Sequence, residues 1–139
     1  MAAVHPEPAA VTAVPLTRRG DHYLLQAVLN DRHPVVLMID TGASITSLSR
    51  ASFARLGRTG FAHQGTRLFN TANGLARGDI YAIDSLAMGD ISLSAGEVAV
   101  LDYTPSGEVD GLLGMNVLRQ FAFEIDQDNA RLLLQPRES

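Results

Sequence analysis

Turn-forming residues divide this chain into short apolar segments, and their spacing limits the folds that it can adopt. Residues 23–29 and 34–39 are separated by Asn30-Asp31, and Asn73-Gly74 divides residues 66–83 into two halves. Short strands joined by such turns are typical of antiparallel sheets, and Asn-Gly is the strongest short signal for a hairpin. The pattern predicts an all-β barrel or sandwich.

The rest of the pattern adds short strands and two short helices. A helix is expected after Ser49, a good N-cap residue, and before Gly57, where a left-handed C-terminal residue is favoured. A second short helix is expected over residues 115–120. Further strands are expected at residues 85–88, 91–93, 97–101, 109–114, 121–126 and 131–135.

Two of the strand segments carry a further expectation. Residues 34–39 are apolar without alternation, which indicates a strand buried on both faces. Pairing outward from Asn73-Gly74 puts Ala72 opposite Leu75, and neither face of this hairpin is clearly apolar near its tip. Such a tip is expected to project into solvent or over a cleft.

Size and composition narrow the function classes. The 139 residues suffice for one domain, expected at residues 14–139 after a flexible tail or linker rich in Ala and Pro at residues 1–13. A net charge of -4 gives no general attraction for nucleic acid or anionic lipid. The chain has no cysteine, which excludes disulfides, thiolate catalysis and Cys-based zinc sites. The histidines lack metal-ligand spacing, so neither a metal nor a cofactor is expected.

The sequence leaves the compartment open. No stretch reaches the roughly 20 apolar residues of a membrane span, and the N-terminus lacks the basic and apolar pattern of a signal peptide. A membrane anchor is therefore expected only if a longer N-terminus has been removed.

The strongest chemical signal is Asp40, which follows the apolar residues 36–39 and precedes Thr41-Gly42-Ala43-Ser44. Desolvation at the end of a buried strand disfavours the charged carboxylate, so this aspartate needs hydrogen-bond donors or a shared proton. Gly42 allows a sharp turn that brings its N–H close to the carboxylate, and Thr41 and Ser44 add hydroxyls within reach. The segment predicts an oriented, partly ionised aspartate.

A second and weaker motif repeats this arrangement later in the chain. Leu112-Leu113-Gly114 leads from a strand through a glycine into a short helix, as residues 35–39 do through the loop that holds Gly42. The echo suggests two related halves within one domain, although it is too weak to count as a sequence repeat.

Other catalytic motifs are missing from the sequence. It contains no Gly-x-Ser-x-Gly elbow, and it has no phosphate loop with a lysine because it has no lysine. Asp110 is a further candidate for the site, because it adjoins the glycine strand. The aspartates near turns or strand ends are expected to be solvated turn residues: Asp79, Asp84, Asp90, Asp102, Asp110, Asp126 and Asp128.

Three segments together resemble one protein family. With Ile39-Asp-Thr-Gly-Ala-Ser44, Asn70-Thr-Ala-Asn-Gly74 and Gly111-Leu-Leu-Gly-Met-Asn116, residues 23–134 resemble the retropepsin-like aspartic proteases, especially the single-domain bacterial ones. The resemblance implies the acid protease fold, a closed β-barrel with half an active site per chain and one or two short helices. It suggests a periplasmic or membrane-anchored bacterial protein if the chain is truncated, and a cytoplasmic one otherwise.

The resemblance also assigns roles to residues. Asp40 would be the catalytic aspartate, Thr41 would hydrogen-bond its counterpart across a dimer axis, and Gly42 would contact the substrate backbone. Ser44 would hydrogen-bond the outer oxygen of Asp40, and Ala43 belongs to the same supporting loop. The remaining residues would form a flap tip that closes over substrate, Thr71, Ala72, Asn73 and Gly74, and a strand beneath the loop, Leu112, Leu113 and Gly114.

This chemistry requires a homodimer. Peptide hydrolysis by aspartates uses two carboxylates that share one proton, and the chain has one Asp-Thr-Gly, so a two-fold axis would supply the second Asp40. The expected function is proteolysis of a polypeptide substrate at acidic pH, by water activated between the two carboxylates. One alternative is a non-catalytic peptide-binding or dimerisation module that keeps the fold, and another is a β-barrel hydrolase of non-peptide substrates.

Overall fold

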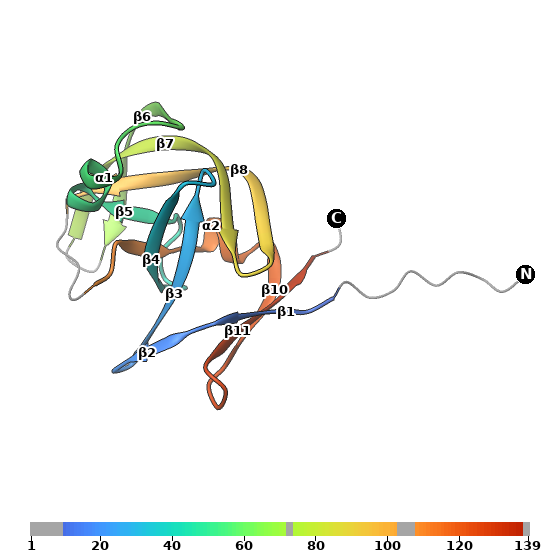
Figure 1. The fold of residues 1–139 in the computed structure, drawn as a ribbon. Helices are drawn as coiled ribbons and strands as arrows, with labels where there is room; N and C mark the ends of the chain where they lie inside the picture. Colours follow the sequence, from blue (N-terminus) through green and yellow to red (C-terminus); the bar gives the residue numbers. More distant parts are fainter. Residues whose placement is uncertain (1–9, 72–73, 103–107, 138–139) are drawn as a thin grey trace, which may run out of the picture.

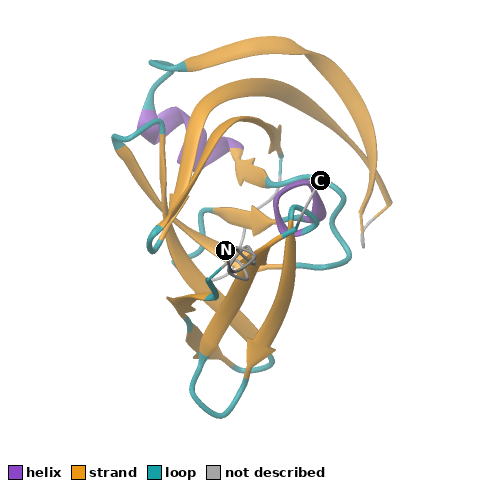
Figure 2. Cartoon of the chain, turned by 90° about the vertical axis from the view of Figure 1, so that its right-hand side faces the viewer, coloured by secondary structure: helices purple, strands orange, loops and turns teal. Residues whose placement is uncertain are grey.

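The computed structural model describes residues 10–71, 74–102 and 108–137. Within these ranges the architecture is mostly β, with two short helices, α1 (Arg50–Leu56) and α2 (Met115–Leu118) (Figures 1 and 2). The strands in chain order are β1 (Thr12–Pro15), β2 (Thr17–Arg19), β3 (His22–Leu29), β4 (His33–Ile39), β5 (Ser47–Ser49), β6 (Phe61–Thr71), β7 (Gly74–Met88), β8 (Ile91–Leu101), β9 (Gly111–Leu113), β10 (Phe121–Asp126) and β11 (Arg131–Pro136).

Six of these strands close into a barrel. The larger sheet has the order β2-β3-β4-β9-β5-β8-β7-β6, and β7 pairs in addition with β3, at Val28–Ala87 and Leu29–Leu86. The ring β3-β4-β9-β5-β8-β7 is therefore closed, which leaves no open edge among its members. The expectation of an all-β chain with a closed barrel and two short helices is confirmed.

The smaller sheet, of order β1-β11-β10, joins the two ends of the described chain and packs against the barrel (blue and red in Figure 1). Its inner face carries Val14, Leu132 and Leu134, each at most 2% exposed, and these side chains belong to the same buried cluster as Leu37 and Leu48 of the barrel. One continuous apolar core therefore supports both sheets.

Helix α1 confirms the boundaries predicted from its caps. The Ser49 hydroxyl accepts a hydrogen bond from the Ser52 N–H at 3.1 Å, and Gly57 ends the helix with a φ of 83°. The buried Phe53 ring lies 5.1 Å from Phe61 and 4.6 Å from Tyr81, between centroids. The helix therefore packs on strands β6 and β7 through aromatic contacts.

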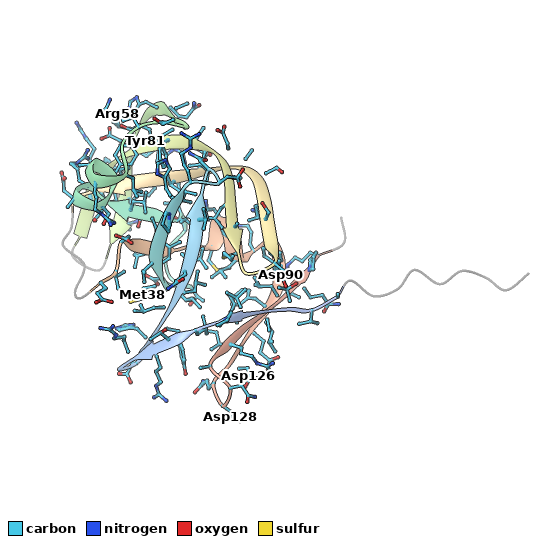
Figure 3. The ribbon with its side chains drawn as sticks, in the orientation of Figure 1. Met38, Arg58, Tyr81, Asp90, Asp126 and Asp128 are labelled. Atoms are coloured by element: carbon cyan, nitrogen blue, oxygen red, sulfur yellow. The ribbon has the colours of Figure 1, made fainter. Side chains whose placement is uncertain are left out.

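The expectation that residues 34–39 are buried on both faces is wrong. Val35 and Leu37 are buried in the core, whereas Val36 and Met38 are half-exposed on the other face. Met38 is labelled in Figure 3, at the lower end of β4. Val36 lines an open groove on that face, so the strand alternates in burial although it does not alternate in sequence.

The predicted register of the second hairpin is also wrong. Thr71 pairs with Gly74 and Asn70 with Leu75, so residues 72–73 connect the strands and Gly74 starts β7 with a φ of 102°. Ala72 and Asn73 themselves lie outside the described residues. The sequence also predicted breaks near Asp84 and near Ser94. In the structure there is no break at either place, because each lies within one continuous strand, β7 or β8.

Candidate active site

Asp40 directly follows β4, at the point where β9 is inserted between β4 and β5. Strand β9 pairs parallel with β4 through Ile39–Leu113 and antiparallel with β5 through Leu112–Ser47. The Asp40 N–H donates to the carbonyl of Leu113 at 3.0 Å. Strand β9, which the sequence predicted to lie beneath the aspartate, therefore binds the backbone of Asp40. The two segments are far apart in the sequence.

The Asp40 carboxyl group is oriented by its own loop. Its Oδ1 accepts a hydrogen bond from the Gly42 N–H at 2.9 Å, and its carbonyl accepts one from Ala43 at 3.2 Å. A Cβ atom at position 42 would lie 3.3 Å from the same Oδ1, so a side chain there would crowd the carboxylate. Asp40 is half-exposed, so its carboxyl group is accessible while one oxygen is engaged.

The rest of the loop is fixed by the start of α2. The Met115 N–H donates to the Ala43 carbonyl at 2.8 Å, and the Asn116 N–H donates to the Ser44 carbonyl at 3.1 Å. At Gly114 a Cβ would lie 2.5 Å from the backbone carbon of Ile45, and at Gly111 it would overlap the Ser47 carbonyl. Both glycines are therefore required for the close approach of β9 to this segment.

Two side chains to which the sequence assigned no role hold this arrangement together. The Thr46 N–H and hydroxyl both donate to Oδ1 of Asn116, and the Thr46 hydroxyl accepts from the Gly114 N–H. Asn116 Nδ2 donates to the Glu97 carbonyl of β8 at 3.0 Å. Asn116 ends the third motif of the family resemblance, but nothing in the sequence indicates that its partner is Thr46.

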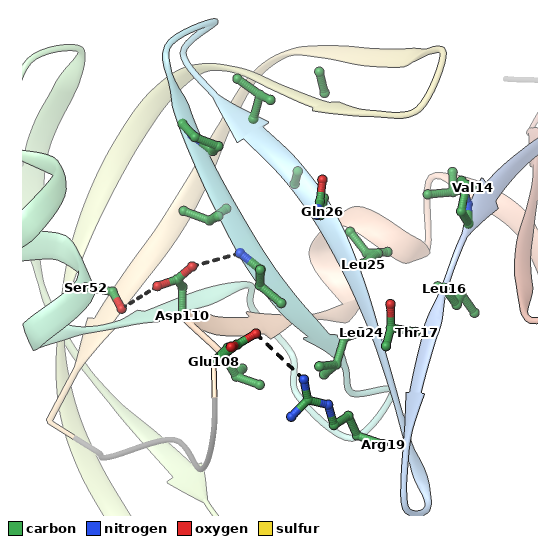
Figure 4. A pocket seen from close by; sticks show the side chains of 18 of the residues that line it. Val14, Leu16, Thr17, Arg19, Leu24, Leu25, Gln26, Ser52, Glu108 and Asp110 are labelled. Carbon is green, nitrogen blue, oxygen red and sulfur yellow. Dashed lines mark hydrogen bonds and ion pairs between the residues drawn. The ribbon is translucent and has the colours of Figure 1, made fainter.

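Asp110 is a structural acceptor, so its prediction as a solvated residue is wrong. Its Oδ2 accepts from the Val36 N–H at 2.8 Å, and its Oδ1 accepts from the Ser52 hydroxyl at 2.8 Å (Figure 4). Oδ1 also accepts from Arg55. The side chain is 15% exposed. Asp110 thus connects β4 with α1 immediately before β9.

Asp79 is likewise paired, with Arg50 and His63, and is not a solvated turn residue. Asp90 and Asp128 are exposed in the β7–β8 and β10–β11 turns, as expected (Figure 3). Asp126 is bound by Arg131 and Asn129, which lower its pKa to about 2.

A groove of about 1250 Å³ lies on the half-exposed face of β3 and β4, between β1–β2 on one side and α1 with residues 108–110 on the other. Figure 4 shows the ion pair between Arg19 and Glu108 at its edge. Asp40 does not line this groove. The groove is therefore separate from the candidate catalytic group.

The predicted flap is the projecting end of the β6–β7 hairpin. A second apolar cluster, separate from the main core, connects this hairpin with the loop after Asp40: Phe69 packs on Ile45, Ile80, Ala99 and Leu101. On the opposite face Leu68 and Leu75 are 64% and 70% exposed. The hairpin thus has one face toward the loop segment and one toward solvent.

Thr41 and Ser44 are exposed in the loop, next to Gly42. The contacts expected from their hydroxyls, across a dimer axis and to Asp40, remain predictions. Among the described residues, no group of three or more His, Asp or Glu side chains could hold a metal ion. No helix in the described part of the chain is long and apolar enough to cross a membrane.

Comparison with known proteins gives one family and one fold. Residues 25–117 match the family Asp_protease_2, described as aspartyl protease. The chain is similar to a retropepsin-like aspartic protease from Rickettsia conorii, with 23% identity and a TM-score of 0.65 over 92% of this chain and 93% of that one. It is also similar to EIAV protease complexed with the inhibitor HBY-793, with 16% identity and a TM-score of 0.59 over 74% and 90% of the two chains. No curated protein sequence matches significantly. The two structures establish the retropepsin-like fold.

Proposed function

Because this chain belongs to the aspartyl protease family, we propose that it is an endopeptidase whose active site contains Asp40 from each of two identical chains. The observation that carries the proposal is the geometry of Asp40 at the end of a barrel strand. Its half-exposed carboxyl group accepts a hydrogen bond from the Gly42 N–H, and its backbone N–H donates to the Leu113 carbonyl. The segment after β9 has Gly114-Met115 where the segment after β4 has Asp40-Thr41. One chain therefore supplies half of a two-carboxylate site.

The proposed reaction uses one proton shared between the two carboxyl groups. Two carboxylates held at about 3 Å do not both ionise, which is the known behaviour of aspartic-protease dyads in general. The ionised carboxylate removes a proton from water, the water oxygen attacks the peptide carbonyl carbon, and the protonated carboxyl donates its proton to the carbonyl oxygen. The carboxyl group that took the proton from water then donates it to the amide nitrogen, while the other carboxylate takes a hydroxyl proton from the intermediate. The C–N bond breaks, two peptides are released, and the pair again holds one proton. The Gly42 N–H keeps the carboxyl group in place throughout.

Digestion of a peptide library from pH 3 to 7, with and without a statine-type inhibitor, tests the activity. The wild-type chain should cleave at acidic pH, and Asp40→Asn should reduce cleavage by about 10²- to 10⁴-fold, the usual effect of removing a general acid–base group. Asp90→Asn is the matched control, because Asp90 is exposed in the β7–β8 turn. Cleavage by Asp40→Asn at the wild-type rate would refute the assignment. Peptide binding without products would favour the non-catalytic peptide-binding module.

Mixing the two forms tests whether two chains share one site. Equal amounts of wild-type and Asp40→Asn chains, allowed to exchange, should show about half the wild-type activity, since random pairing leaves about half of the wild-type chains with a wild-type partner. Unchanged activity would contradict the shared site. Sedimentation at several chain concentrations should show a dimer whose appearance parallels the activity.

A further inference from the structure

The β6–β7 hairpin has a projecting end and a buried base, and the change between them is sharp along β7. Along β7, residues 74–77 are exposed or half-exposed, whereas Gly78, Ile80 and Tyr81 are buried. Opposite this level, β6 has an irregularity in register between His63 and Gly65, where Gly65 has a φ of 126°. Such a bulge bends a strand and changes its twist. Asp79 lies at the level where the projecting part begins.

Four charged or titratable side chains meet at this level, and we call them the hairpin-base cluster: Arg50, His63, Asp79 and Asp102. Arg50 Nη2 lies 3.1 Å from Asp79 Oδ2, and Arg50 Nε lies 2.6 Å from Asp102 Oδ1. His63 Nε2 lies 3.3 Å from Asp79 Oδ1. In the Arg50–Asp79 pair the Asp79 side chain is 25% exposed and the Arg50 side chain 46%, so the pair is only partly screened by solvent.

Arg50 connects the hairpin with the segment that carries Asp40. It is the first residue of α1, directly after β5, and β5 pairs with β9 beneath the Asp40 loop. Asp79 belongs to the hairpin, and Asp102 directly follows β8. Since one guanidinium bridges both carboxylates, its contacts fix the base of the hairpin relative to the segment that begins at Asp40.

We propose that Arg50 is a positioning residue that holds the β6–β7 hairpin over the Asp40 loop and thereby sets how tightly a polypeptide substrate is bound. This inference rests on the proposed proteolytic function for its reference to substrate. Arg50 acts through Asp79 and Asp102 and is not itself a catalytic residue. Its removal should loosen the hairpin, weaken substrate binding and leave the chemical step nearly unchanged.

The charges around Asp79 suit an enzyme that works at acidic pH. The hydrogen bond with His63, followed by that with Arg50, lowers the pKa of Asp79 below its ordinary value. Within the cluster, Asp102 is bound to Arg50, and the Tyr81 ring lies beside the cluster, with its centroid 5.2 Å from that of His63. The bridge from Arg50 to Asp79 therefore persists into the acidic range in which two Asp40 carboxyl groups would share a proton.

Hydrogen exchange measured on the intact protein tests the positioning role without reference to activity. Arg50→Gln should raise the exchange of amides in β6 and in residues 74–80 of β7 about fivefold, the effect of losing an interaction of this strength. Arg55→Gln is the matched control, because it removes an ion pair between the same helix and Asp110 instead of the hairpin. Unchanged exchange in Arg50→Gln, or an equal rise in Arg55→Gln, would overturn the proposal.

Steady-state kinetics on a cleaved peptide provide the second measurement. Arg50→Gln should raise KM about fivefold with kcat within about twofold of wild type, whereas a loss of folded protein would lower the apparent kcat and leave KM unchanged. Arg50→Lys should have a KM between those of wild type and Arg50→Gln, because one ammonium group replaces only part of the bridge. A fall in kcat alone would contradict the positioning role. If the wild-type chain cleaves no peptide while the exchange pattern is as expected, the proposed function fails and the structural role of Arg50 stands.

Discussion

Thr46 donates two hydrogen bonds to one atom, Oδ1 of Asn116: its backbone N–H lies at 2.7 Å and its hydroxyl at 2.8 Å. Thr46 is 1% exposed, so its N–H has no access to bulk water as a substitute. The same hydroxyl accepts from the Gly114 N–H at 3.0 Å. This pair of residues therefore fastens the loop after Asp40 to both β9 and α2.

Asn116→Ala should lower the free energy of unfolding by about 3 kcal/mol, because it leaves the Thr46 N–H and the Glu97 carbonyl without their partner. Urea unfolding measures the change. Gln120→Ala is the control just after the same helix; its side chain makes an exposed hydrogen bond, and the change should stay within about 0.5 kcal/mol. A loss below about 1 kcal/mol in Asn116→Ala would show that the lock contributes little.

Gly111→Ala should prevent stable folding or cost more than about 3 kcal/mol, because the new Cβ would overlap the Ser47 carbonyl in the adjacent strand and both backbones are fixed. Gly96→Ala is the matched control, since its Cβ would make ordinary contact with Ile83 at 3.6 Å. Thermal unfolding of the two variants gives the comparison. Equal melting temperatures would mean that β9 can move away from β5.

Asp110→Asn should destabilise the fold by about 2 kcal/mol. The amide keeps the size of the side chain, but it cannot accept from the Val36 N–H, the Ser52 hydroxyl and Arg55 together. Ser52→Ala removes one of these bonds and should cost about 1 kcal/mol. Urea unfolding of both variants checks the order, and a larger loss in Ser52→Ala than in Asp110→Asn would contradict the central role of Asp110.

Asp126 should make folding stability depend on pH at the acidic end. Arg131 and Asn129 lower its pKa from the ordinary value of 3.8 to about 2. Since the folded-state pKa is the lower one, the stabilisation is complete above the ordinary value and is lost as the pH falls toward 2. Asp126→Asn should therefore flatten the decline in stability between pH 5 and about pH 2.5. The slope of unfolding free energy against pH measures this, and Arg131→Gln should reproduce part of the flattening, because the Asn129 hydrogen bonds remain.

Local signals in the sequence predicted local structure well. Ser49 and Gly57 are capping residues for reasons of side-chain and backbone conformation, and both ends of α1 follow them. Gly42 was expected to bring its N–H close to Asp40, and it does so at 2.9 Å. The Asn73-Gly74 signal indicated the hairpin correctly but not its register, because Gly74 uses its positive φ in the first residue of β7.

Contacts across the barrel could not be predicted in the same way. Thr46 and Asn116 are 70 residues apart, and Asp110 and Val36 are 74 residues apart. In its own segment each of these side chains is an ordinary polar residue. Its partner comes close only in the folded barrel, where β9 lies between β4 and β5. The roles of Asp40, Thr41, Ser44 and the flap residues remain predictions, which peptide digestion and chain mixing address.

The insertion of β9 between β4 and β5 has a consequence for the order of events during synthesis. On the ribosome, Asp40 emerges about 70 residues before Leu113, whose carbonyl holds it, and native contacts of such separation form late. A nascent or prematurely terminated chain that lacks β9 carries the aspartate without the strand that supports it. The proposed active site therefore cannot assemble until β9 has been synthesised, however early Asp40 itself leaves the ribosome.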